Sequence, residues 1–226
     1  MKILIKFPSR GRPDQFKKVL KLYRDKLENP QNTKFVFSFD VDDFSMNNLD
    51  IINFINELNI NHEVFYGNNK NKIEAINANL ENQFFDILIL ASDDMIPVVD
   101  CYDTKIIEYF QNSNLGLDCM LHTQSTRWSD LLDINCIMGW DYFKRFGYIY
   151  HSSYKSIFAD NEYTEISKML GRNVFTPGFC PFFHDWKGGD ETEIKNFQFN
   201  NEDNLVYEER RKNNFFITSG DTTTIN

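Results

Sequence analysis

The stretch FDILILASDD, residues 85–94, decides the fold of this chain of 226 residues. It begins with an apolar run that only Asp86 interrupts, as expected of a β-strand buried on both faces of a parallel sheet. The run ends in Ser92, Asp93 and Asp94. In open parallel α/β sheets, ligands bind outside the carboxyl ends of the strands. The stretch therefore predicts a core strand with a polar site directly after it.

On both sides of this strand, apolar runs alternate with helical periodicity. Up to Pro97, the expected strands are 2–7, 34–39, 62–66 and 85–91, and the expected helices are 14–27, 51–58 and 72–80. Beyond it, a weaker pattern predicts strands over 118–122 and 135–138 and helices over 103–110, 163–170 and 204–212. The alternation predicts an α/β fold with a central, mostly parallel sheet flanked by helices.

Length and composition indicate an ordinary globular protein. We expect one domain over residues 1–219, with halves 1–97 and 98–219 and a flexible tail over 220–226.

The net charge of −9 disfavours contact with phosphate backbones, so no nucleic-acid partner is expected. No apolar run is long enough for a transmembrane segment. The four cysteines form no CxxC pair, which favours reduced thiols and a cytoplasmic location over zinc or disulfides.

Charged and hydroxyl side chains gather directly after three of the expected strands. They are Ser9, Arg10, Arg12, Asp40, Asp42, Asp43, Ser92, Asp93 and Asp94. Guanidinium groups bind phosphate oxygens in bidentate geometry. Adjacent carboxylates repel each other unless a cation is present, and Mg²⁺ or Mn²⁺ prefers such oxygen ligands. The pattern indicates a site for a divalent cation and a phosphate-bearing ligand, although any single Asp here can also cap a helix or form a turn.

Seven motifs in this order resemble the GT-A fold glycosyltransferases, family 2-like. The motifs are FPSRGRP (7–13), FSFDVDD (37–43), NKIEAINANL (71–80), FDILILASDDM (85–95), IMGWDYF (137–143), FADNEYTEISKMLG (158–171) and PFFHDWKGGDET (181–192). The resemblance spans roughly residues 2–215. It implies a GT-A type domain with a Rossmann-like nucleotide-binding half, 1–97, and an irregular acceptor half, 98–219.

The resemblance also implies roles for individual residues. The nucleotide-binding residues would be Pro8, Ser9, Arg10, Arg12, Asp40, Lys72, Ser92 and Asp93. The metal ligands, for Mn²⁺ or Mg²⁺, would be Asp94, Asp93 and His184, in the place of the family's Asp-x-Asp (DXD) motif and later His. The catalytic base would be Asp160, with Glu162 as the second candidate. The implied activity is metal-dependent hexosyl transfer from a nucleotide-sugar, expected to be a UDP-sugar, to a hydroxyl of a carbohydrate or glycoconjugate, with inversion.

Two positions depart from the family pattern. Ala91 stands where the four-residue metal motif has its first Asp, so both Asp93 and Asp94 stay candidates for the metal. Ala159 stands where the family has a Glu before the catalytic base. The choice of Asp160 as the base therefore rests only on its position in the motif, and Asp160 is equally placed to be a helix N-cap.

Other functions stay open at this point. A sugar-phosphate nucleotidylyltransferase needs a Gly-rich loop, but FPSRGRP holds a single Gly. Metal-dependent phosphoesterases usually need several His, and one of the four is well placed. A non-enzymatic carbohydrate-binding or assembly module with the same fold is a further alternative. Three Trp side chains, at 128, 140 and 186, can stack on sugars or simply pack in the core.

Overall fold

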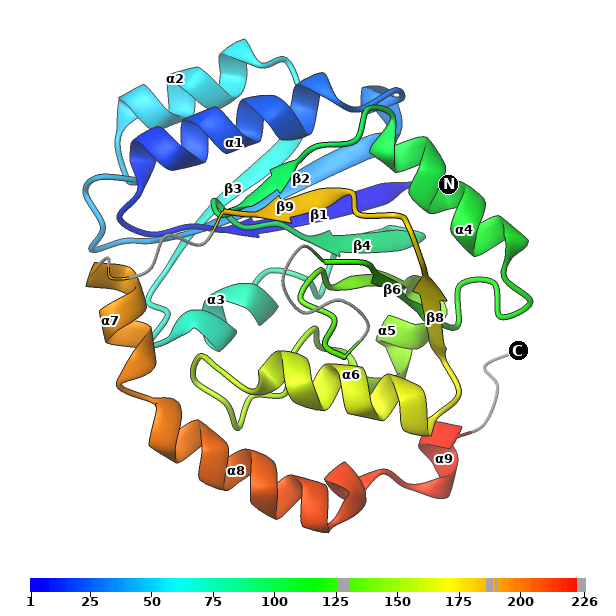
Figure 1. Cartoon of the computed structure of the whole chain (residues 1–226). Helices are drawn as coiled ribbons and strands as arrows, with labels where there is room; N and C mark the ends of the chain where they lie inside the picture. The colour runs from blue at the N-terminus through cyan, green and yellow to red at the C-terminus, as the bar shows by residue number, and fades with distance from the viewer. Residues whose placement is uncertain (126–130, 186–188, 190, 223–226) are drawn as a thin grey trace.

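The computed structural model describes residues 1–125, 131–185, 189 and 191–222, and its centre is a seven-stranded sheet (Figure 1). The strands are β1 (Ile3–Pro8), β2 (Thr33–Asp40), β3 (Asn61–Gly67), β4 (Ile87–Leu90), β6 (Met120–Thr123), β7 (Ile137–Gly139) and β8 (Asn173–Thr176). Their order across the sheet is β3-β2-β1-β4-β7-β6-β8. The first four in this order pair in parallel, β7 is antiparallel to β4 and β6, and β8 is parallel to β6. The expected α/β fold with a mostly parallel sheet is confirmed.

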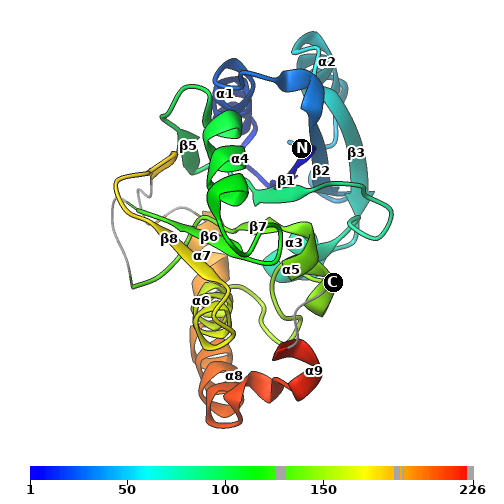
Figure 2. The same cartoon turned by 90° about the vertical axis from the view of Figure 1, so that its right-hand side faces the viewer.

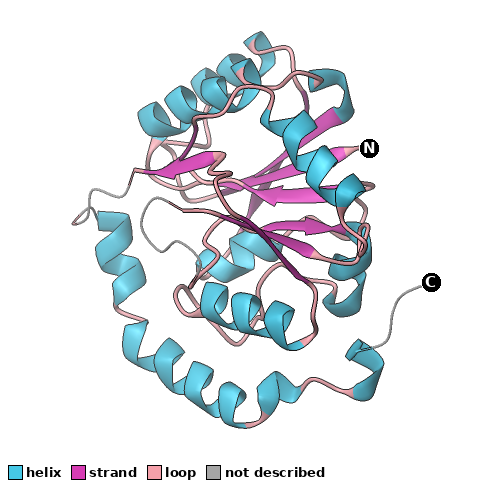
Figure 3. Cartoon of the chain, turned by 45° about the vertical axis from the view of Figure 1, so that its right-hand side comes forward, coloured by secondary structure: helices cyan, strands magenta, loops and turns pink. Residues whose placement is uncertain are grey.

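Helices cover both faces of the sheet, which therefore lies between two layers (Figures 2 and 3). The α-helices are α1 (Pro13–Asp25), α2 (Leu49–Glu57), α3 (Lys72–Asn77), α4 (Tyr102–Asn112), α5 (Trp140–Phe146), α6 (Ala159–Met169), α7 (Glu191–Phe197), α8 (Asn200–Lys212) and α9 (Ser219–Thr222). Two short 3₁₀ helices, η1 (Pro30–Asn32) and η2 (Asn214–Phe216), complete the set. Within the described ranges, no helix is long and apolar enough to cross a membrane.

The core has one apolar cluster on each face of the sheet. On one face, Phe16 of α1, Ile51 of α2 and Ile106 of α4 pack against β1, β2 and β4. On the other face, α3, α5 and α6 pack against the same sheet, and Tyr207 brings α8 onto the outer side of α6. Because β1 and β4 meet helices on both faces, their side chains are almost all buried, which explains the unbroken apolar run of β4.

The structure also contains a small second sheet, whose strands are not among those expected from the sequence. Strand β5 (Met95–Pro97) pairs antiparallel with β9 (Phe182–His184), and Met95 lies opposite His184. Each strand has three residues, which is too few for an alternating pattern to be visible. The pairing brings His184 next to the end of the core strand.

The change from parallel to antiparallel pairing occurs beside Gly139, the last residue of β7. A Cβ atom at this position would lie 2.2 Å from the carbonyl oxygen of Leu117, so no larger residue fits without moving the backbone. Trp140 follows directly and opens α5, where its ring packs edge-on against Phe85 with ring centroids 5.0 Å apart. One of the three Trp side chains therefore packs in the structure, while Trp128 and Trp186 lie outside the described residues.

A lysine side chain of the sheet is buried in the core. Lys6 of β1 is fully buried, and its ammonium group donates to the hydroxyl of Ser38 and to the carbonyl of Ala78, at 2.7 Å from the latter. Burial lowers the pKa of Lys6 to about 7, with the negative charge of Glu81 acting in the opposite direction. The folded chain thus releases a proton in a pH range where the unfolded chain keeps it.

We expect Lys6→Met to change the pH dependence of stability. Between pH 7 and 9 the unfolded chain binds more protons at Lys6 than the folded chain, so the wild type should gain stability over the variant as pH rises. The gain should be about 1.4 kcal/mol per pH unit, in urea unfolding at several pH values. Lys18→Met, at an exposed lysine, is the matched control and should show no such trend. A stability difference between wild type and Lys6→Met that stays constant with pH would contradict a neutral Lys6.

Candidate active site

The carboxyl ends of β1, β2 and β4 bring the expected site residues to one edge of the sheet. Because β1 pairs in parallel with both neighbours, Pro8 lies opposite Ser38, and Lys6 lies opposite Leu90. The loops that follow these strands, residues 9–12, 41–43 and 91–94, therefore emerge side by side.

Asp93 is tied to the loop between β1 and α1. Its carboxylate accepts a hydrogen bond from Ser9 Oγ at 3.0 Å and pairs with an Arg12 guanidinium nitrogen at 2.8 Å. Gln15 donates to its backbone carbonyl at 3.0 Å. Burial raises the pKa of Asp93, and the charge of Arg12 opposes that rise. Both carboxylate oxygens of Asp93 thus have partners within the loop between β1 and α1.

Asp94 faces a different set of partners. Ser92 donates a hydrogen bond to one carboxylate oxygen, and Nε2 of His184 lies 3.6 Å from the other. The backbone N–H of Asp185 also donates to the carbonyl of Asp94 at 2.8 Å, which fixes β9 against this loop. Burial acts to raise the pKa of Asp94, but the contact with His184, the Ser92 hydrogen bond and the charge of Lys72 outweigh it. The net effect holds this pKa well below its usual range, so Asp94 is ionised at neutral pH.

Asp160 lies in the first turn of α6. The residue before this helix, Phe158, is left-handed with φ of 63° and acts as its N-cap without a side-chain hydrogen bond. Asp160 is therefore not the N-cap residue itself, although its carboxylate accepts a hydrogen bond from the N–H of Asn161 in the first turn at 3.0 Å. Burial raises the pKa of Asp160, and the positive charge of Lys72 partly offsets this.

Lys72 links the two acidic positions. It begins α3 directly after the N-cap Asn71, whose side chain accepts from the N–H of Glu74 at 2.9 Å. The charge of Lys72 lowers the pKa of both Asp94 and Asp160. Asp94 and His184 are thus in contact, and Lys72 is close enough for its charge to act on both Asp94 and Asp160.

Arg10 and Asp40 form the outer part of the site. Arg10 pairs with Asp40 at 2.8 Å and binds Asp42 with two nitrogens, at 2.6 and 2.9 Å. The other oxygen of Asp40 accepts from the side chain of Asn69 at 2.8 Å. Sequence reasoning missed Asn69 because it lies in a polar loop between β3 and α3 that carries no recognisable motif. Asp43 is a turn former here, since it accepts from the N–H of Ser45 two residues later at 3.2 Å, and its other oxygen accepts from the N–H of Gly11 at 2.7 Å.

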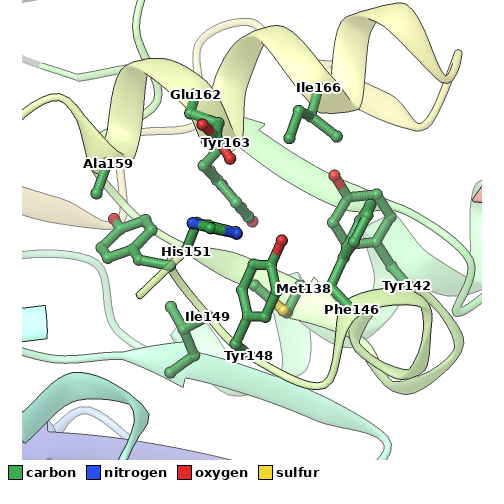
Figure 4. A pocket seen from close by; sticks show the side chains of 11 residues that line it. Met138, Tyr142, Phe146, Tyr148, Ile149, His151, Ala159, Glu162, Tyr163 and Ile166 are labelled. Atoms are coloured by element: carbon green, nitrogen blue, oxygen red, sulfur yellow. The ribbon is translucent and has the colours of Figure 1, made fainter. Parts of the chain in front are cut away.

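Glu162 is not brought to this region. Its buried carboxylate binds Arg210 of α8 through two nitrogens, at 2.7 and 2.9 Å, and accepts from the hydroxyl of Tyr154 at 2.8 Å. With His151 and several tyrosines it lines a small cavity of about 20 Å³ on the inner side of α6 (Figure 4). The ion pair between Glu162 and Arg210 therefore joins α6 to α8.

The donor set around Asp94 suits a divalent cation bound together with a ligand. In the part of the chain that the structure describes, no three His, Cys, Asp or Glu side chains cluster as a complete metal site. Asp94 and His184 nevertheless meet, and Nδ1 of His184 is buried without a hydrogen-bond partner among these residues. Mg²⁺ and Mn²⁺ are commonly held by one or two side chains and complete their shell with phosphate oxygens and water. The two side chains fit this mode, whereas Asp93 is engaged by Arg12.

The sheet order, the β5–β9 pair and the acidic edge define a GT-A-like fold, the fold of nucleotide-sugar glycosyltransferases. One similar solved structure is the mannosyltransferase PcManGT from Pyrobaculum calidifontis in complex with GDP-Man and Mn²⁺. Its TM-score is 0.69 at 8% identity, over 92% of this chain and 64% of that chain. Another is S. aureus TarS 1–349 in complex with UDP-GlcNAc, with a TM-score of 0.65 at 13% identity, over 85% of this chain and 61% of that chain.

The similarity is one of fold. The chain spans less than two thirds of the length of these two structures, at 64% and 61%. No family model and no curated protein sequence matches it. The resemblance seen in the sequence is thus confirmed for the fold, and the roles of the site residues remain proposals.

We expect Arg12→Met to destabilise the protein more strongly at pH 7 than at pH 5. Without Arg12 the buried Asp93 carboxylate has lost its cation, and its pKa rises further, so stability falls as pH rises through that range. The loss at pH 7 should be about 1–3 kcal/mol in urea unfolding. Arg24→Met, which removes an exposed ion pair to Asp25, is the matched control and should cost less than about 0.5 kcal/mol. Equal losses at both pH values would show that Arg12 does not hold the charge of Asp93.

Proposed function

We propose that this chain is a metal-dependent glycosyltransferase that moves a sugar from a nucleoside-diphosphate donor to an acceptor hydroxyl with inversion. The observation that carries the proposal is the contact between Asp94 and His184 after the core strand, together with the charge of Lys72, which lowers the pKa of both Asp94 and Asp160. This gives a cation-binding pair and a separate carboxyl group at the carboxyl edge of a nucleotide-binding sheet. The GT-A-like fold supports the same class.

The nucleotide would lie along the loops after β1 and β2. Asp40 offers a carboxylate to N–H groups of the base, and Asn69 and Arg10 fix its orientation. Positive charge on the side of the diphosphate would come from Arg12 and Lys72. The nucleotide pocket between them would be lined by Pro8, Ser9, Ser92 and Asp93. A UDP-sugar is the proposed donor. PcManGT is in complex with GDP-Man and TarS with UDP-GlcNAc or UDP, so both bases belong in the assay.

Asp94 and His184 would hold Mn²⁺ or Mg²⁺. When bound, the cation neutralises the negative charge that gathers on the departing diphosphate. Asp94 is suited to this role because its lowered pKa keeps it ionised at neutral pH. Asp93 would act beside it by holding Arg12 at the nucleotide loop.

Asp160 would be the general base. Its carboxylate would take the proton of the acceptor hydroxyl while that oxygen attacks the anomeric carbon. The bond to the diphosphate breaks on the opposite face of the sugar, so the configuration inverts. Burial raises the pKa of Asp160, which makes it a stronger base than an exposed carboxylate. The acceptor would be a carbohydrate or glycoconjugate that offers this hydroxyl.

We expect UDP to stabilise the protein strongly only when Mn²⁺ or Mg²⁺ is present. Ligand binding to the folded state at a hundred times Kd contributes about 2.7 kcal/mol. For a chain of this size that is roughly 5–10 °C in a thermal-shift measurement. Asp94→Asn should lose the metal-dependent part, and Asp100→Asn, an exposed control, should keep it. An equal shift in EDTA would contradict the cation site, and a shift with GDP instead of UDP would change the proposed donor.

We expect Asp160→Asn to lower turnover by roughly 10²–10⁴-fold while donor binding is kept, because an amide cannot take a proton. The measurement is sugar transfer or donor hydrolysis with UDP- and GDP-sugars. Glu162→Gln should reduce stability, since it weakens the pair with Arg210, but leave turnover per folded molecule nearly unchanged. Full activity of Asp160→Asn would show that Asp160 is not the general base. Nucleotide-sugar binding without any turnover of the wild type would favour a binding module instead.

A further inference from the structure

One polar face of α8 is joined to the segment that carries Asp160. Three residues of α8 at successive turns, Asp203, Tyr207 and Arg210, contact the chain from residue 155 to residue 162. Asp203 binds the turn before α6, Tyr207 stacks on Phe158 with ring centroids 5.5 Å apart, and Arg210 binds Glu162. Helix α8 lies along the outer side of α6 (Figure 1).

Asp203 is the unusual member of this face. It is a fully buried carboxylate in the first turn of α8, and no cation pairs with it in the described part of the chain. It instead accepts three backbone hydrogen bonds from consecutive residues: Lys155 at 2.9 Å, Ser156 at 2.8 Å and Ile157 at 2.9 Å. Such a group of N–H donors stabilises a buried anion, and the positive end of the α8 dipole adds to it.

The turn that Asp203 holds leads directly into a strained residue and then into the proposed base. Phe158 has a left-handed backbone with φ of 63°, which is unfavourable for a large aromatic residue and persists only where its surroundings fix it. Asp203 holds the three N–H groups before Phe158, and Tyr207 covers its ring. Asp160 follows two residues later, so its position depends on this backbone.

The same turn also contacts α3. The N–H of Lys155 donates to Asp203, and the carbonyl of Lys155 accepts from the N–H of Ile73 at 3.4 Å. Ile73 follows Lys72 in α3, and the charge of Lys72 acts on Asp160. One residue of the turn therefore connects α8, α3 and the start of α6.

We propose that Asp203 is a positioning residue for the transfer reaction, which fixes Asp160 relative to Lys72 through its three hydrogen bonds to residues 155–157. This inference rests on the proposed function, since it needs Asp160 to act on substrate. Among the described residues, the hydrogen bonds of the Asp203 carboxylate all come from backbone N–H groups, so Asp203 would influence turnover rather than donor binding. A shift of about 1 Å in a catalytic group can lower the rate by 10²-fold.

The test uses Asp203→Asn in the full chain. Asn keeps the size of the side chain but has one acceptor oxygen, and its NH₂ group would face N–H donors. We expect faster hydrogen exchange over residues 155–160, with residues of β1 and α1 unchanged. We also expect a fall in kcat of about 10–100-fold with donor KM within about twofold of the wild type. Arg211→Gln is the matched control, because it breaks another α8–α6 pair, Arg211–Glu165 at 3.2 Å, without touching the turn.

The outcomes separate this inference from the proposed function. Unchanged exchange over residues 155–160, or faster exchange with wild-type kcat, would overturn the positioning role while the transferase stands. An inactive wild type would overturn the proposed function, and the positioning role with it. If Asp203→Asn does not fold, Tyr207→Leu replaces it, since it removes the other α8 contact from Phe158. It should show the same two effects, and wild-type exchange and kcat in that variant would overturn the inference.

Discussion

The parallel pairing of β1 with both β2 and β4 is the constraint on which the site depends. Register between these strands aligns their carboxyl ends, so three loops that are distant in sequence emerge at one edge. Arg12 and Ser9 then bind Asp93 and join the first loop to the third. The result is a rigid network of buried hydrogen bonds and ion pairs. This network supports the more exposed carboxylates, which can contact a ligand.

Three carboxyl groups of the site differ in protonation behaviour although they have the same chemistry. Burial raises the pKa of Asp93 and of Asp160, while the partners of Asp94 hold its pKa low. Asp94 is thereby suited to bind a cation and Asp160 to receive a proton. Environment rather than residue type separates these two roles, as is general for pairs of acids in active sites.

Much of this arrangement could be predicted from the sequence. The buried run at 87–90 and the polar residues after each strand led to the sheet edge, because periodicity and parallel topology are local and general signals. The β5–β9 pair could not be predicted, since three-residue strands that are far apart in the sequence leave no pattern. The roles of Asn69, Arg210 and Asp203 were also missed, because a polar residue in a loop or on a helix shows its partner only after folding. The same limit left Glu162 as a candidate base, although Arg210 occupies its carboxylate.

The β5–β9 pairing determines when the candidate cation site forms during folding. Asp94 belongs to the first half of the chain and His184 to its last fifth, and they are brought together by the β5–β9 pair and by the hydrogen bond from the N–H of Asp185 to the carbonyl of Asp94. Contacts between segments so far apart in sequence form slowly, because a long loop must close first. A chain in which β9 is not yet paired would therefore contain Asp94 but no competent cation pair. A ligand held by both residues would in turn stabilise the pairing of β5 with β9, because it binds only the form in which the two residues meet.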